Sequence, residues 1–135
     1  PLSARADKPQ GTGPGPTVVG GQEGLVTHCS SGTSMGNSVS RTSMRGISMT
    51  EMSMGMIEGN QVRDAAGVGI LCNDHSMCMI EENSVIGTKR VPGSEWTGGY
   101  GVLVSYSSEG ELRRNALLAN PRPYGAIVES TITER

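Results

Sequence analysis

The chain has 135 residues, a net charge of −2 and 3% aromatic residues, with no Phe. This length suffices for one modest domain, and the balanced charge without interleaved aromatic and basic residues argues against a nucleic-acid partner. No apolar run approaches the roughly 18 residues of a membrane span. With 20 Gly, 7 Pro and so few aromatic side chains, the chain is poorly supplied for a conventional sandwich or helical bundle.

The N-terminal residues, 1–17, are rich in Pro and Gly and have no apolar periodicity. This composition predicts a flexible arm. The chain begins with neither an initiator Met nor a signal-peptide pattern, so we expect it to be processed or a fragment of a longer protein.

An internal repeat begins after this arm. Asn37, Asn60 and Asn83 recur at one constant interval, and each opens an Asn-x-Val segment. The interval from Asn83 to Asn115 is longer, and the surplus falls near residues 89–98, which we interpret as a loop insert. A fixed period of this kind indicates a repeat architecture.

Apolar residues alternate within each copy, which is typical of half-buried strands. The alternating pairs are Ile47 and Met49, Ile70 and Cys72, and Val102 and Val104. Three short strands per copy, stacked at about 4.8 Å, describe a parallel β-helix over residues 18–135. The prediction is an all-β solenoid of about four to five coils with a 23-residue repeat.

The Gly-Val/Ile pair of one strand and the Ile-Glu-x-Asn-x-Val pattern of the next turn resemble right-handed parallel β-helix repeats. These repeats occur in the carbohydrate-binding and sugar-hydrolase β-helix superfamily, which includes pectate lyases, alginate epimerases and a periplasmic copper-maturation accessory protein. The resemblance covers residues 24–128 and implies a right-handed coil and an extracytoplasmic location. It also implies that the Asn column forms an asparagine ladder, made of Asn37, Asn60, Asn83 and Asn115.

Glycines and cysteines receive structural interpretations. The repeated glycines, Gly46, Gly69, Gly101 and Gly125, are expected in tight turns with unusual backbone angles. Three cysteines are an odd number without C-x-x-C spacing, so neither a disulfide framework nor a structural zinc site is predicted. Cys72 and Cys78 are expected to point inward as small hydrophobic residues, and His28-Cys29 to occupy a surface corner without an evident partner.

A methionine cluster is the most unusual feature of the sequence. Strand alternation, counted from the inward-pointing Ile57 and Ile80, places four methionines on one outer face: Met54, Met56, Met77 and Met79. Met52 and His75 lie at the edge of this face. An apolar strip of this kind favours contact with another chain or domain. Inward packing through a different strand phase is one alternative. Binding of Cu(I) by the soft thioethers and His75 is another.

Acid–base chemistry has one candidate set. Glu51 and Asp74 occupy equivalent positions one coil apart, and His75 follows Asp74; Glu109 and Glu111 are further candidates. The Asp-rich calcium cluster of pectate lyases and an epimerase-like Asp-Pro-His are missing from the sequence. These absences weigh against an enzyme without excluding one.

The aromatic residues Trp96, Tyr100 and Tyr106 cluster in and after the insert. They are candidates for gripping a glycan or a partner, and a Trp that pins the loop to the body is the alternative.

The leading hypothesis is a non-catalytic recognition or scaffold module that binds a glycan or a protein through the methionine face and the Trp96 loop. A polysaccharide lyase, epimerase or hydrolase acting through Glu51, Asp74 and His75 is the first alternative, and a Cu(I)-handling accessory protein is the second. No resident cofactor is expected, and copper enters only under the second alternative. Because a short β-helix exposes apolar ladders at its ends, we expect an oligomer or a larger assembly.

Overall fold

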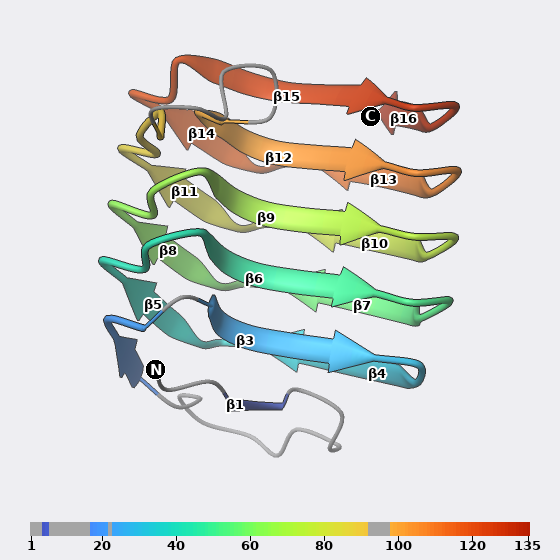
Figure 1. Cartoon of the computed structure of the whole chain (residues 1–135), viewed down its shortest axis with the longest axis horizontal. Coiled ribbons are helices and arrows are strands. Elements are labelled where there is room, and N and C mark those ends of the chain that lie inside the picture. Colours follow the sequence, from blue (N-terminus) through green and yellow to red (C-terminus); the bar gives the residue numbers. More distant parts are fainter. Residues whose placement is uncertain (1–3, 6–16, 22, 92–97) are drawn as a thin grey trace.

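The computed structural model describes residues 4–5, 17–21, 23–91 and 98–135. Every regular element in these ranges is a β-strand, and the strands wind into five stacked coils (Figure 1). No helix among these residues is long and apolar enough to cross a membrane. The all-β prediction is confirmed.

Each coil contributes one strand to each of three parallel sheets. Sheet A contains, in spatial order, β1 (Ala4–Arg5), β3 (Glu23–His28), β6 (Arg45–Thr50), β9 (Val68–Asn73), β12 (Tyr100–Ser105) and β15 (Arg122–Ile127). Sheet B contains β2 (Thr17–Val19), β5 (Ser38–Ser40), β8 (Gln61–Arg63), β11 (Ser84–Ile86) and β14 (Ala116–Leu118). Sheet C contains β4 (Ser31–Met35), β7 (Met54–Glu58), β10 (Met77–Glu81), β13 (Glu109–Arg113) and β16 (Thr131–Glu134).

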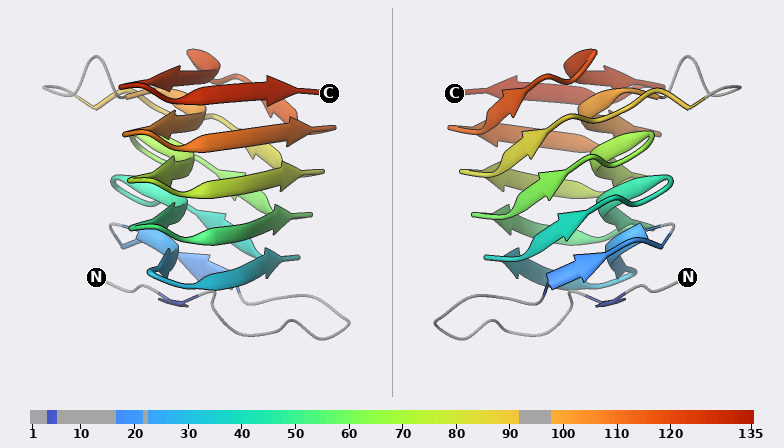
Figure 2. Two further views of the ribbon diagram at one scale, coloured as in Figure 1. Left: turned by 90° about the vertical axis from the view of Figure 1, so that its right-hand side faces the viewer. Right: turned by 90° about the vertical axis from the view of Figure 1, so that its left-hand side faces the viewer.

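The coil is right-handed. In Figure 1, β3 crosses the front, β4 returns behind it, and the next coil lies one level higher. The two side views in Figure 2 show the same regular stack. Strands pair in parallel at the expected period, as in Val39 with Val62 and Val62 with Val85. The predicted right-handed parallel β-helix is confirmed.

Columns of aliphatic side chains fill the interior. Val62, Ile70 and Ile80 are each 0% exposed, and each lies beside an apolar residue in the coils above and below. Because each coil repeats the same short inward set, the core closes without any large aromatic residue. This explains how a chain with few aromatic residues builds a buried centre.

A ladder of asparagine side chains runs along the corner between sheets C and B. The backbone N–H and the side-chain amide of Asn37 both donate to Asn60 Oδ1 at 2.9 Å. Asn60 makes the same pair of bonds to Asn83, and Asn83 to Asn115. The remaining amide proton of Asn60 is donated to the Ser34 carbonyl at 2.8 Å. The side-chain NH2 groups of Asn37, Asn60 and Asn83 are thus paired with the neighbouring coil, whereas Asn37 Oδ1 at the N-terminal end of the ladder has no hydrogen-bond partner among the described residues.

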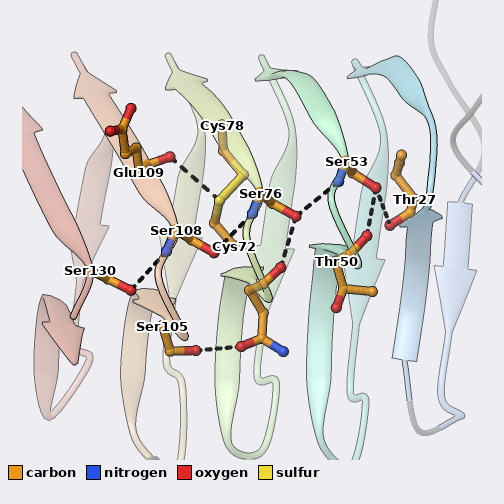
Figure 3. The surroundings of a disulfide bond; sticks show 11 residues. Thr27, Thr50, Ser53, Cys72, Ser76, Cys78, Ser105, Ser108, Glu109 and Ser130 are labelled. Atoms are coloured by element: carbon orange, nitrogen blue, oxygen red, sulfur yellow. Dashed lines mark hydrogen bonds between the residues drawn. A yellow bond between two sulfur atoms is a disulfide. The ribbon is translucent and has the colours of Figure 1, made fainter. Parts of the chain in front are cut away.

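A second ladder, made of serines, runs along the corner between sheets A and C. The backbone N–H of Ser53 donates to Ser76 Oγ at 3.1 Å, and that of Ser76 donates to Ser108 Oγ at 3.0 Å (Figure 3). The series extends from Ser30 at one end to Ser130 at the other. This ladder was not predicted, although its first three serines follow the 23-residue spacing of the repeat.

The interpretation of four repeated glycines as turn residues is wrong. Gly46, Gly69, Gly101 and Gly125 lie inside strands of sheet A and are not among the residues with positive φ. A Cβ at Gly69 would lie 2.4 Å from Val85 Cγ1 and 2.7 Å from the Gly101 carbonyl oxygen. At Gly46, Gly69 and Gly101, a side chain and a backbone carbonyl oxygen of the next coil occupy the space of a Cβ atom, and at Gly125 the Tyr100 ring occupies it.

The prediction of unpaired cysteines is also wrong for two of the three. Cys72 on β9 and Cys78 on β10 point inward as expected, at 0% and 3% exposure, but they form a disulfide across the corner (Figure 3). Strand alternation alone places both side chains in the same interior, and the short separation of six residues lets them meet.

Two predicted segments fall largely outside the described residues. In the N-terminal arm, residues 4–5 form β1, which pairs in parallel with β3 at Leu25 and Val26. Of the insert near residues 89–98, residues 92–97 and therefore Trp96 are outside the described part of the chain.

The side chain of Asn60 accepts two hydrogen bonds through Oδ1 and donates two through its NH2 group, and replacement by Ala removes all four. Because the buried backbone N–H of Asn37 then lacks its acceptor, we expect a loss of about 2 kcal/mol or more in the free energy of unfolding. Urea denaturation measures this loss. Asn115→Ala is the matched control, and its loss should be smaller because water reaches this partly exposed position. Equal losses would contradict the buried-ladder account.

The disulfide predicts a simple thiol count. Alkylation of the denatured protein without reductant should label one of its three cysteines, and alkylation after reduction should label all three. Intact-mass spectrometry distinguishes these states. Three labelled cysteines before reduction would show that the disulfide does not form.

Candidate functional site

The outer surface of β7 and β10 carries four methionines, which we call the methionine face: Met54, Met56, Met77 and Met79. Met54, Met77 and Met79 are 57%, 48% and 40% exposed. Strand alternation explains this placement, because the intervening Cys78 and the following Ile80 are buried. Inward packing of these methionines is therefore ruled out.

The register between β7 and β10 brings these methionines into two lateral pairs. Met54 lies opposite Met77, and Met56 lies opposite Met79. Neighbouring parallel strands are about 4.8 Å apart, so the two thioethers of each pair leave the sheet side by side. The face thus concentrates four soft sulfur donors on two adjacent strands.

An open groove of about 950 Å³ runs across this face. Beyond the methionines, β13 places Glu109 opposite Met77 and Glu111 opposite Met79. The Glu111 carboxylate also lies 3.4 Å from Arg135 Nε. Hydroxyl-bearing residues complete the lining, namely Ser31, Thr33, Thr131 and Thr133. The groove therefore combines sulfur donors with a bordering row of carboxylates.

Met52 and His75 lie at the corner between sheets A and C, directly before the two methionine-bearing strands. Both have positive φ, and Met52 is 72% exposed. His75 Nδ1 lies 3.1 Å from Asp74 Oδ1. Neither Met52 nor His75 is among the described residues that line the groove. They flank the methionine face rather than forming its floor.

The three candidate catalytic residues occupy the same corner without converging. The backbone N–H of Met52 donates to the Asp74 carbonyl, which stacks the corners of the second and third coils. Asp74 contacts His75, whereas the Glu51 carboxylate is directed at the first coil. All three side chains are 44% to 65% exposed. The structure thus shows one carboxylate–imidazole pair and a separate Glu51.

The aromatic candidates have different surroundings. Tyr100 packs beside the small apolar cluster of Val68, Leu71 and Leu103 on the outer side of sheet A, and the guanidinium carbon of Arg122 lies 5.0 Å from its ring centroid. Tyr106 is 48% exposed at a corner with positive φ. The third member, Trp96, lies outside the described residues.

Glu51 takes part in a cluster that was not predicted from the sequence. Its carboxylate lies 2.7 Å from His28 Nε2, and Cys29 Sγ donates to it at 3.4 Å. His28-Cys29 therefore does have a partner. The signal was in the sequence, because the first copy is one residue short and this shift stacks Cys29 on Glu51.

The fold and its outer face define a right-handed parallel β-helix with a methionine-bearing sheet. A family model described as periplasmic copper-binding protein (NosD) matches residues 11–134. The chain belongs to this family. No curated protein and no solved structure gives a significant match to the chain.

Exposure predicts how the methionines oxidise. Brief treatment of the folded protein with peroxide should convert Met52, Met54, Met77 and Met79 to sulfoxides and spare Met49, which is 1% exposed. Peptide mass spectrometry measures the extent at each position. Oxidation of Met49 at the rate of Met54 would contradict the assignment of inner and outer faces.

Proposed function

We propose that the protein is a periplasmic accessory protein that carries Cu(I) on the methionine face. The observation that carries this proposal is the lateral pairing of Met54 with Met77 and of Met56 with Met79 on adjacent strands. Thioethers are soft ligands suited to Cu(I), and the chain's family is described as copper-binding. Copper is here the cargo of the protein rather than a resident cofactor.

The donor set fits a cuprous ion in its chemistry. Each pair presents two thioethers at the spacing of neighbouring strands, and methionine side chains have enough rotatable bonds to converge on one ion. The rigid sheet holds the Cα atoms in place, so binding requires side-chain rotation only. Glu109 and Glu111 border the same groove and favour the approach of a cation electrostatically. Met52 and His75 offer additional donors at the edge of the face.

A carrier must also exchange its ion with another protein. The same exposed thioether strip supports contact with a protein partner, because methionine adapts its shape to different apolar surfaces. This proposal keeps the protein-contact part of the recognition hypothesis. Glycan recognition and polysaccharide cleavage gain no comparable support, since Tyr100 packs against its own sheet and the three acid–base candidates do not converge.

The test is a Cu(I) titration against a competing chromophoric chelator under anaerobic conditions. Replacing all four face methionines by Leu keeps side-chain volume and removes the sulfur donors. We expect Cu(I) affinity to fall by at least about 100-fold because the sulfur ligands themselves are lost. The free energy of unfolding should change by no more than about 0.5 kcal/mol per substitution, since Met54, Met77 and Met79 are exposed and Met56 is only half-buried.

Met44→Leu is the matched control. Met44 is 44% exposed but lies before β6, away from the methionine face, so its replacement should leave the affinity unchanged. Unchanged Cu(I) affinity in the fourfold Leu variant, or no stoichiometric binding by the wild type, would refute the proposal.

A further inference from the structure

The corner between β3 and β4 brings three different metal-ligating groups together. His28 Nε2 lies 2.7 Å from Glu51 Oε2, and Cys29 Sγ lies 3.4 Å from the same oxygen. One imidazole nitrogen, one sulfur and one carboxylate oxygen all fall within 4.8 Å of one another. This cluster is separate from the methionine face and contains no methionine.

The fold builds this cluster from two neighbouring coils. His28 is the last residue of β3 and lies opposite Thr50, the last residue of β6. The Cys29 N–H then donates to the Thr50 carbonyl at 3.3 Å, which aligns Cys29 with Glu51. Cys29 and Glu51 both have positive φ, at 48° and 55°. The two ends of the cluster are therefore fixed to each other through the backbone of sheet A.

The corner of the first coil is shorter than the corner above it. Two residues, 29–30, separate β3 from β4, whereas three residues, 51–53, separate β6 from β7. The corresponding corner of the third coil has Asp74 and His75 but offers no thiol. Only the first corner, among those described, combines all three ligand types.

We propose that His28, Cys29 and Glu51 form a Zn²⁺ site that is distinct from the Cu(I) face. Nitrogen, thiolate sulfur and carboxylate oxygen are the ligands that zinc uses, and three protein ligands leave a fourth position for water. Around a tetrahedral zinc ion, bonds of about 2.0–2.3 Å place neighbouring ligand atoms about 3.3–3.7 Å apart. The 3.4 Å between Cys29 and Glu51 already matches this separation.

Binding needs only a small change in the side chains. The 2.7 Å hydrogen bond between His28 and Glu51 must open by about 0.6 Å for both atoms to coordinate one ion. The Cys29 thiol releases its proton to water, and the resulting thiolate and carboxylate balance the two charges of zinc. His28 and Glu51 are 43% and 44% exposed, so the ion can reach the site directly from solvent.

The donor set also separates this site from the copper face. A carboxylate oxygen is a hard ligand that suits a divalent ion better than Cu(I), whereas thioethers have the opposite preference. Zinc at this corner would join the ends of β3 and β6 and so stabilise the folded protein against unfolding. The site therefore links the two N-terminal coils through an ion whose fourth ligand is water.

The test uses Co²⁺ and Zn²⁺ as probes on the whole chain, without reductant and under anaerobic conditions so that the Cys72–Cys78 disulfide stays intact. Co²⁺ should produce a thiolate-to-cobalt charge-transfer band at one equivalent, and Zn²⁺ should displace it. Cys29→Ser should abolish the band. Glu51→Gln and His28→Asn should each weaken Co²⁺ binding by at least about tenfold.

The corner of the third coil supplies matched controls. Asp74→Asn and His75→Asn change a carboxylate and an imidazole at the equivalent corner and should leave Co²⁺ binding unchanged. The fourfold Leu variant of the methionine face should also keep the band, which separates this proposal from the copper proposal. Absence of a charge-transfer band in the wild type, or a band that persists in Cys29→Ser, would overturn the zinc site.

Discussion

Parallel, in-register hydrogen bonding between successive coils is the constraint on which the rest of the structure depends. Each strand pairs with its equivalent one coil away, so each residue lies beside the residue one repeat earlier and one repeat later. A side chain that recurs at the same position of each repeat therefore forms a column along the stack. The buried Val and Ile columns, the Asn ladder and the Ser ladder all stabilise the fold in this way. In the two polar ladders, the buried Asn60 and Ser76 gain hydrogen-bond partners from the next coil.

The same constraint produces two chemically different surfaces. On the flat face of sheet C, strand pairing places identical residues side by side. The two methionines of β7 and the two of β10 therefore form a group of four adjacent thioethers, with the carboxylates of β13 beside them. At the corners, the backbone leaves the sheet, and a difference of one residue between coils brings unlike groups together. His28 and Cys29 meet Glu51 for this reason. The methionine face therefore suits a soft ion such as Cu(I), and the corner of His28, Cys29 and Glu51 suits an ion of intermediate softness such as Zn²⁺.

The repeat made the architecture and the methionine positions predictable, because a fixed period and strand alternation together determine which side chains stack and which point outward. Other features depend on packing that alternation does not describe. Gly69 is needed because Val85 and the Gly101 carbonyl occupy the space of its Cβ, which no local turn signal indicates. The Cys72–Cys78 disulfide crosses a corner, where two inward positions from different sheets meet. Glu51 and Asp74 occupy equivalent positions in the repeat, which suggested a common site. The Glu51 carboxylate instead contacts His28 and Cys29 of the shorter first copy.

Crystals of the Cu(I)-loaded protein, measured at the copper absorption edge, test the central claim most directly. If the methionine face carries the ion, the anomalous difference map will show copper above β7 and β10, beside the side chains of Met77 and Met79. Copper located instead at the corner of His28 and Glu51, or no ordered copper in a protein that binds it in solution at one equivalent, would contradict this account.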